Sequence, residues 1–334
     1  MAKGYKPAYR KTKAATSVSV KIIIALLVVL VITLAAFLIK VIVKDALDPG
    51  IVYPPETTDD YSLPPQTDAP EVTTEKVDNS VEVRAVEASK FEKGCGTLLL
   101  VNKNNPYTYG APRELVSLFD ERHDNFTLAT ASEQLSTEAY EALARMTDAY
   151  AERNGYCPLM ITSGYRDEAK QKEYYDNYVV NESDKAYVEL PGYSDHHTGL
   201  CFDVKLYDKD GVSYSYGRYA TEKAAWIVEN YKNYGFIMRY PANKGSFTGI
   251  EGETNHFRYV GLPHSVYIAD KVICLEEYLN TVRSYTYESP LYIPIEHDEY
   301  YVWYCTGDTV YVPREGEYTV SDDNTGGFVV TVKQ

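Results

Sequence analysis

The chain has 334 residues, enough for one substantial hydrophobic core with further segments beside it. Hydrophobic residues make up 45% of it and charged residues 24%, a composition that excludes wholesale disorder. The formal net charge of -15 argues against nucleic acid as a partner, because no excess of Lys and Arg remains to neutralise phosphates.

An apolar segment near the N-terminus predicts a membrane anchor at residues 22–43. Its centre, residues 22–39, is an uncharged stretch of 18 residues that would be about 27 Å long as a helix. Basic residues precede it and acidic residues follow it, so the positive-inside rule places residues 1–21 in the cytoplasm and the rest of the chain outside the cell membrane. A cleaved signal peptide is the alternative, but the stretch exceeds the usual signal core of roughly 7–15 residues.

Residues 44–90 are predicted to be a linker, since Pro, Thr and acidic residues dominate and no apolar periodicity persists. The linker would hold a folded domain away from the bilayer. Beyond it lie five cysteines, whose spacing matches no CxxC metal motif and whose odd number leaves at least one unpaired in a monomer. An exported domain permits disulfides, so we expect one or two at most, with the other cysteines buried as small apolar side chains.

Residues 91–283 have the pattern of one globular domain. Strand and helix candidates intermix without a regular βαβ repeat, which favours an α+β fold with a mixed or antiparallel sheet over a doubly wound sheet. In chain order the predicted elements are a strand at 97–102, a helix at 137–153, a strand and turn at 159–166, a helix at 167–178, a strand at 201–208, a helix at 221–235, and strands at 236–241 and 256–262.

Residues 284–334 are predicted to form a small all-β accessory domain. Short alternating segments such as YYVWYC and GFVVTV are separated by turn signals such as TGD and SDDNTGG. This domain would pack on the main domain, bind cell-surface material or dock an envelope partner. It carries no recognisable chemistry.

The segment SDHHTGLCFD, residues 194–203, holds two of the six histidines. A turn at Gly199 would bring Asp203, in the strand that follows, back towards His196. An imidazole nitrogen and a carboxylate oxygen are normal zinc ligands, but two ligands do not complete a site. His197 can replace His196 in this interpretation, and spacing alone does not choose between them.

The segment ETNHFRYVG, residues 253–261, offers the missing ligand. His256 supplies a second imidazole, and two His with one carboxylate leave the fourth zinc position for water, as in catalytic sites. Glu253 lies three residues earlier and is placed to take the proton from that water.

The segment SGYRDEAKQ, residues 163–171, adds Arg166 at a strand-to-helix turn, where its guanidinium suits an oxyanion or a substrate carboxylate. Gln171 would face the same cleft. The simpler alternatives are a solvated surface turn for the His–Asp pair and an ordinary salt bridge for the arginine. His123, His264 and His297 have no clustered partners and are assigned structural roles.

Together the three segments resemble the signature of the VanY-type D-alanyl-D-alanine carboxypeptidases, the zinc peptidases of the M15 family. The family pattern is similar to SGYR-x4-Q, S-x-H-x2-G-x-A-x-D and E-x2-H-x-R-Y-V-G, in that order. The likeness covers roughly residues 95–280 and includes neither the anchor and linker nor the C-terminal segment.

The resemblance implies one Zn²⁺ per chain, bound by His196, Asp203 and His256 with water as the fourth ligand. It therefore selects the first of the two adjacent histidines. It also implies that Glu253 is the general base and that Arg166 stabilises the tetrahedral intermediate.

Ser194 and Gln171 match family positions near the substrate and are predicted to bind it. Three positions depart from the family pattern. Cys201 replaces a small Ala, which a buried site tolerates. Thr254 and Asn255 replace the common Pro-Trp pair between the base and the last ligand, which would change a wall of the substrate pocket and hence the substrate preference.

The expectation is a membrane-anchored, extracytoplasmic zinc carboxypeptidase that removes the C-terminal D-alanine from peptidoglycan stem peptides. An L,D-carboxypeptidase, a D,D-dipeptidase or a cell-wall endopeptidase with the same zinc chemistry is the nearest alternative. A non-catalytic wall-binding or sensor protein is less favoured, because Glu253 is present.

Overall fold

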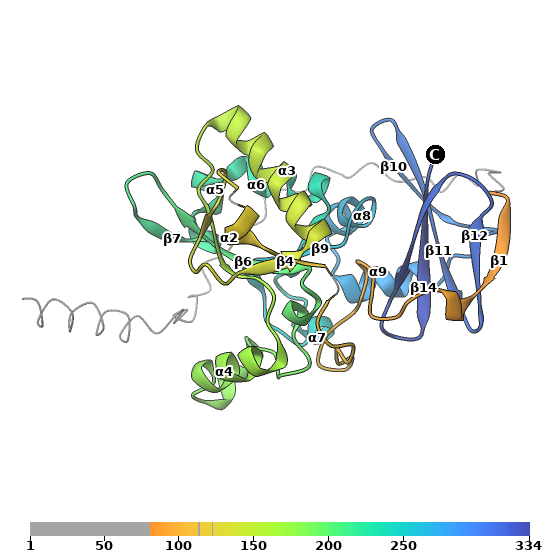
Figure 1. The fold of residues 1–334 in the computed structure, drawn as a ribbon, viewed down its shortest axis with the longest axis horizontal. Helices are drawn as coiled ribbons and strands as arrows, with labels where there is room; N and C mark the ends of the chain where they lie inside the picture. The colour runs from red at the N-terminus through yellow and green to blue at the C-terminus, as the bar shows by residue number, and fades with distance from the viewer. Residues whose placement is uncertain (1–80, 113, 122) are drawn as a thin grey trace, which may run out of the picture. The chain divides into compact units, whose positions relative to one another are not determined.

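The computed structural model describes residues 81–334, apart from 113 and 122. Its largest sheet has strand order β3-β5-β6-β9-β8, with β7 added beside β6 (Figure 1). The strands are β3 (Thr127–Leu128), β5 (Leu159–Ser163), β6 (Cys201–Tyr207), β7 (Ser213–Ser215), β8 (Phe236–Tyr240) and β9 (Glu253–Tyr259). β3 and β5 run parallel and the other neighbours antiparallel, so the predicted mixed α+β fold is confirmed.

Helices and short strands surround this sheet. The longest helix of the described residues, α3, begins after Ser136, whose hydroxyl accepts a hydrogen bond from the Ala139 amide, and it buries Leu143 and Met146 in the main core. The helical elements are η1 (Ala88–Lys90), α2 (Leu118–Glu121), α3 (Thr137–Asn154), α4 (Glu168–Tyr178), η2 (Glu182–Ala186), η3 (Asp195–Thr198), α5 (Tyr216–Lys223), α6 (Ala225–Asn230), η4 (Tyr231–Tyr234), α7 (Gly245–Thr248), α8 (His264–Lys271) and α9 (Leu275–Val282). A separate two-stranded sheet joins β2 (Leu115–Ser117) and β4 (Gln134–Ser136).

The predicted helix at 221–235 is wrong as a single element. It is divided between α5, α6 and η4, because Ala224 leaves the helical conformation at φ -140° and ψ 33°. Ala224 is fully buried, and the break lets Ala220 of α5 and Ile227 of α6 face the same core. The predicted end at Gly235 is correct, with a left-handed φ of 88°.

The predicted strand at 97–102 is also wrong. This segment is buried, but its carbonyl groups bond to arginine side chains instead of a neighbouring strand. Arg258 donates to the carbonyl oxygen of Leu99 at 2.9 Å, and Arg239 donates to that of Val101 at 3.2 Å. Buried carbonyl groups need a hydrogen-bond donor, and here the two guanidinium groups supply the donors that a paired strand would otherwise supply.

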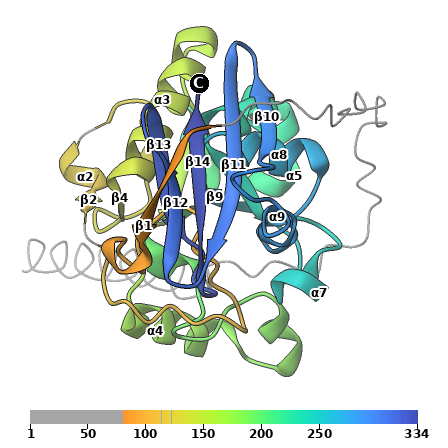
Figure 2. The same ribbon diagram turned by 90° about the vertical axis from the view of Figure 1, so that its right-hand side faces the viewer.

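The C-terminal residues form a four-stranded antiparallel sheet with the order β10-β11-β14-β13. Its strands, with the adjoining β12, are β10 (Leu291–Ile295), β11 (Asp298–Thr306), β12 (Thr309–Pro313), β13 (Glu317–Asp322) and β14 (Gly327–Lys333). β12 pairs with β1 (Val83–Glu87), and Figure 2 shows these two strands side by side. The predicted linker, which runs to residue 90, therefore extends too far.

This C-terminal sheet buries side chains on both of its faces. On one face, Val302 and Val329 share a core with Leu98, Ile237 and Leu279 of the preceding region. The opposite face has a second core cluster centred on the fully buried Trp303. Residues 284–334 thus depend on the rest of the chain for part of their core, and the envelope partner expected for them stays a prediction.

His264 joins three elements at this shared core. It begins α8, its Nδ1 atom bonds the hydroxyl of Tyr278 on α9, and its Nε2 atom lies 3.1 Å from the hydroxyl of Thr331 on β14. Burial lowers the pKa of His264 from 6.5 to about 3. The assigned structural role agrees with these contacts.

The His264 pKa makes stability depend on pH. Between pH 6.5 and 3 the unfolded chain binds a proton that the folded chain does not, so stability falls as the pH falls through this window. We expect this group to lower the free energy of unfolding by up to about 1.4 kcal/mol per pH unit. Urea unfolding at pH 7, 6 and 5 measures the slope, and His264→Gln should reduce it; an unchanged slope would contradict the assignment.

Among residues 81–334, positions 113 and 122 aside, no helix combines the length and the apolar character that crossing a bilayer requires. The predicted anchor at residues 22–43 lies outside the described residues, as do the cytoplasmic segment 1–21 and most of the linker. Cys157, Cys201, Cys274 and Cys305 are buried, and none of these four forms a disulfide within the described part of the chain.

Candidate metal and catalytic site

The turn between β5 and α4 is held against β4. The amide of Gly164 donates to the buried carboxylate of Glu133 at 2.6 Å, and the amide of Tyr165 donates to the carbonyl oxygen of Gln134 at 2.7 Å. A Cβ atom on Gly164 would lie 2.4 Å from that same carbonyl oxygen, so only glycine fits. The turn therefore presents the carbonyl group of Gly164 and the side chain of Arg166 in fixed positions.

The predicted turn at Gly199 is confirmed. Ser194 caps η3 by accepting a hydrogen bond from the amide of His196 at 3.4 Å, and Gly199 ends η3 with a left-handed φ of 69°. The chain then enters β6, where Asp203 stands directly opposite His256 of β9. Segments more than fifty residues apart in sequence thus meet through one antiparallel strand pair.

Asp203 lies between the two predicted histidine ligands. One carboxylate oxygen is 3.2 Å from Nε2 of His196, and the other is 3.0 Å from Nδ1 of His256. Burial alone would raise the pKa of Asp203, but the neighbouring imidazoles outweigh it and hold that pKa well below its usual range. The carboxylate is therefore ionised and aimed at both histidines.

These side chains fit a zinc ion. The Nδ1–H group of His196 donates to the carbonyl oxygen of Gly164 at 2.6 Å, so Nε2 is the ring nitrogen that would coordinate a metal. Two imidazoles and a carboxylate are a usual zinc ligand set. The separations of 3.2 Å from Nε2 of His196 and 3.0 Å from Nδ1 of His256 to the two oxygens of Asp203 bring the three side chains close enough to share one ion.

The potential ligand atoms of the described residues form two compact groups that share His256. One group contains Asp203 and Glu253, and the other contains His196 and Cys201; within each group the ligand atoms lie within 4.8 Å of one another. The predicted set of His196, Asp203 and His256 takes members from both groups. Cys201 is the member that the sequence interpretation set aside.

His197 is engaged elsewhere. Its Nδ1–H group donates to the carbonyl oxygen of Arg166 at 2.7 Å, and its Nε2 atom accepts a hydrogen bond from the amide of Gly192 at 3.0 Å. Burial is the main cause that lowers the His197 pKa and favours this neutral form. With both ring nitrogens occupied, His197 holds two loops together and has no atom left for a metal.

The two adjacent histidines therefore make a matched pair of variants. His197→Ala is expected to keep metal binding and to lower the free energy of unfolding by about 1–3 kcal/mol, because buried polar groups lose their partners. His196→Ala is expected to lose tight zinc binding. Zinc content and urea unfolding measure both effects, and loss of zinc in the His197 variant would overturn the assignment.

Glu253 begins β9 and lies beside the metal-ligand candidates. Its carboxylate is 3.9 Å from Nδ1 of His256, and its side chain remains about 24% exposed. Burial and the nearby carboxylates of Glu189 and Asp203 raise the pKa of Glu253 to about 8, although the histidines oppose this. The raised pKa means that this carboxyl group holds a proton strongly, as a group that takes a proton from water must.

Arg166 approaches the same group from the turn after β5. Its Nη1 atom donates to the hydroxyl of Ser163 at 3.1 Å and lies 3.6 Å from the carboxylate of Asp203. Its guanidinium lies over the ring of Tyr174, 4.6 Å from the ring centre. The arginine is thus buried and fixed, and its charge faces the candidate metal position.

Asp195 is the buried neighbour that sequence interpretation missed. Its carboxylate accepts a hydrogen bond from Arg258, lies 3.5 Å from Nε of Arg239, and lies 3.8 Å from Nε2 of His256. Arg239 in turn pairs with Glu276 at 2.8 Å. Asp195 and its arginine partners thus hold the Nε2 edge of the His256 ring, while the Nδ1 edge faces Asp203.

This chain is similar to two curated proteins and to one solved structure. The D-alanyl-D-alanine carboxypeptidase of Enterococcus faecium is 32% identical over 261 residues, which cover 76% of this chain and 80% of that protein. The family model described as VanY, D-alanyl-D-alanine carboxypeptidase, matches residues 132–262.

The chain belongs to the VanY family of D-alanyl-D-alanine carboxypeptidases. Its predicted family and its predicted enzyme class, a hydrolase of the carboxypeptidase type, are thereby confirmed. The bifunctional D-Ala-D-Ala dipeptidase and carboxypeptidase VanXYC of Enterococcus gallinarum is 35% identical over 199 residues, 57% of this chain and 98% of that protein. The crystal structure of the vancomycin resistance D,D-dipeptidase VanXYg superposes with a TM-score of 0.65 and 28% identity, over 76% of this chain and 99% of that one.

All seven predicted site residues fall within the matched VanY region, residues 132–262. The two predicted substrate residues have structural contacts of their own. Besides capping η3, Ser194 is fully buried. Gln171 is also fully buried, and its side-chain amide donates to the carbonyl oxygen of Glu189 at 2.8 Å while its Oε1 atom has no partner in the described part of the chain. Their substrate roles stay predictions.

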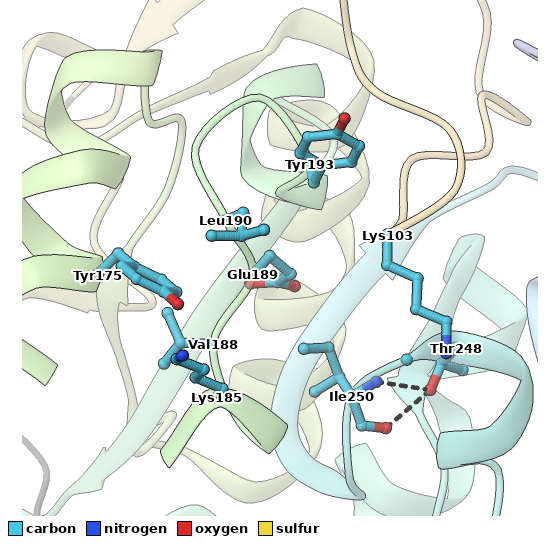
Figure 3. A pocket seen from close by; sticks show the side chains of 10 residues that line it. Lys103, Tyr175, Lys185, Val188, Glu189, Leu190, Tyr193, Thr248 and Ile250 are labelled. Atoms are coloured by element: carbon cyan, nitrogen blue, oxygen red, sulfur yellow. Dashed lines mark hydrogen bonds between the residues drawn. The ribbon is translucent and has the colours of Figure 1, made fainter. Parts of the chain in front are cut away.

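A pocket in this VanY-family domain adjoins the site. Glu189 lies among the side chains that line it, with Tyr175 on one side and Lys103 on the other (Figure 3). The Glu189 carboxylate also accepts a hydrogen bond from the hydroxyl of Tyr240, whose ring lies 5.0 Å from that of His256. The pocket and the metal-ligand candidates are therefore connected by two side chains.

Proposed function

We propose that this chain is a membrane-anchored, extracytoplasmic zinc D,D-carboxypeptidase that removes the C-terminal D-alanine from peptidoglycan stem peptides. The observation that carries the proposal is the meeting of His196, Asp203 and His256 beside Glu253 and Arg166 in a chain of the VanY family. The apolar segment at residues 22–43, with basic residues before it and acidic residues after it, supports the anchor and its orientation.

The mechanism assigns one task to each side chain. His196, Asp203 and His256 would hold zinc, which when bound supplies a Lewis acid and lowers the pKa of water. Glu253 takes the proton from the attacking water and then passes it to the amine of the leaving D-alanine. Arg166, held by Ser163, directs its charge at the oxyanion that develops on the scissile carbonyl group.

A D,D-dipeptidase is the second candidate. The relative from Enterococcus gallinarum carries both names, and the superposing crystal structure is that of a D,D-dipeptidase. Thr254 and Asn255 precede His256 on β9 and stand where the family pattern has Pro-Trp. The side chains at these two positions of the substrate pocket would therefore differ from those of the family. An L,D-carboxypeptidase or an endopeptidase would use the same catalytic groups.

Mass spectrometry of products from defined substrates separates these activities. The full-length protein is incubated with a pentapeptide stem, a tetrapeptide stem and free D-Ala-D-Ala, each with and without a chelator. D,D-carboxypeptidase activity predicts chelator-sensitive release of D-alanine from the pentapeptide and none from the tetrapeptide. Release from the tetrapeptide alone, or from the free dipeptide alone, would overturn the proposal in favour of the corresponding alternative. Membrane fractionation with and without residues 22–43 tests the anchor.

A further inference from the structure

Cys201 lies on the same face of β6 as Asp203, because side chains two apart on a strand point to one side. Phe202 between them points into the hydrophobic core. Across the strand pair, Cys201 stands opposite Arg258 just as Asp203 stands opposite His256. The thiol is fully buried and therefore belongs to the layer of side chains that surrounds the metal-ligand candidates.

Two histidines converge on this thiol. The ligand atoms of Cys201, His196 and His256 lie within 4.8 Å of one another, and all three side chains are buried. Both histidines also contact carboxylates: Nε2 of His196 lies 3.2 Å from Asp203, and Nδ1 of His256 lies 3.0 Å from the same side chain. A thiol beside two buried imidazoles is a ligand set that favours zinc and other soft or borderline cations.

Charged side chains surround the thiol and the two histidines. Asp195 and Glu276 are matched by Arg258 and Arg239, so that network is neutral by itself. Asp203 already lies 3.6 Å from a guanidinium group. A divalent cation would add two positive charges to this buried site, where Asp203 and Glu253 supply carboxylates and Arg166 a positive charge, and a thiolate ligand would lower the net charge by one unit.

We infer that Cys201 is a thiolate ligand of the metal ion held by His196 and His256, beside Asp203. The inference rests on the proposed function for the identity of that ion. Binding forms one sulfur–metal bond and releases the thiol proton to water. With four protein ligands available, water joins as a fifth ligand or replaces one of them, both of which zinc permits. The expected consequence is tighter retention of zinc than two imidazoles and one carboxylate alone provide.

Cobalt substitution tests this ligand without reference to turnover. The full-length protein, kept in mild detergent because residues 22–39 are apolar, is loaded with Co²⁺ and its absorption spectrum is recorded. A thiolate ligand gives an intense sulfur-to-cobalt charge-transfer band in the near ultraviolet. We expect the band in the wild type and in Cys157→Ala, which removes another buried thiol, and no band in Cys201→Ala or Cys201→Ser.

Chelator competition supplies a second measurement, made on variants whose circular dichroism matches that of the wild type. Cys201→Ala is expected to weaken zinc binding by about 10-fold or more. Losing a residue that only supports a metal ligand already weakens metal binding by about that much. A wild-type spectrum without the band, a band that persists in both Cys201 variants, or unchanged zinc affinity would overturn the inference. If the protein hydrolyses stem peptides but shows no charge-transfer band, only the thiolate ligand is disproved. If the band is present but no stem peptide is hydrolysed, only the proposed function is disproved.

Discussion

Glu253→Gln is expected to slow D-alanine release from a pentapeptide stem by about 10²–10⁴-fold while the protein keeps its zinc. Glutamine preserves the shape of the side chain but cannot take a proton from water. Because the three predicted ligands are unchanged, metal content measured on the purified protein should match that of the wild type. This variant is therefore expected to lose hydrolytic activity without losing its zinc.

Glu251→Gln is the matched control. This exposed carboxylate lies two residues earlier in the same segment, and its side chain has no assigned role in the site, so near wild-type turnover is expected. A Glu253→Gln protein that cleaves at the wild-type rate would disprove the base assignment. Loss of zinc in that variant would instead identify Glu253 as a ligand, in the group it forms with Asp203 and His256.

Asp195→Asn is expected to lower the free energy of unfolding by about 3–5 kcal/mol, because it leaves Arg258 and Arg239 buried without a full counter-charge. For a domain of this size, each kcal/mol corresponds to about 2–4 °C in melting temperature. Zinc affinity should also fall by about 10–100-fold, since His256 loses the charge behind its ring. Thermal unfolding and chelator competition measure the two effects.

The control for this variant is Asp176→Asn. Asp176 pairs with Lys172 one helical turn away, but both side chains are more than half exposed, so its removal should cost less than about 1 kcal/mol. Equal losses in the two variants would show that burial of the charge network contributes nothing special to stability.

Local patterns predicted the elements that carry the site. The turn before Arg166, the turn at Gly199 and the strand after it follow from glycine and from apolar alternation within a few residues, and the structure has all of them. The meeting of His196 with His256 required pairing between β6 and β9, which spacing alone does not determine. The resemblance to a family supplied that information.

The predicted strand at residues 97–102 was wrong because its partners are distant side chains. The segment at 97–102 has the composition of a strand, yet its partners are Arg239 and Arg258, which follow it by more than a hundred residues. A signal was present, because an arginine inside an otherwise apolar strand usually marks a buried ion pair. The same reasoning would have identified Asp195 as the buried counter-charge of Arg239 and Arg258.

The pairing of β1 with β12 has a consequence for how this protein is made. The amide of Gly94 bonds the side chain of Asp322, 228 residues away, and the amide of Leu98 bonds Ser321, 223 residues away. The first described residues to leave the ribosome therefore find their partners only when the last ones have been synthesised. Such high contact order predicts slow folding that is completed after synthesis ends, with residues 83–101 joining the fold late.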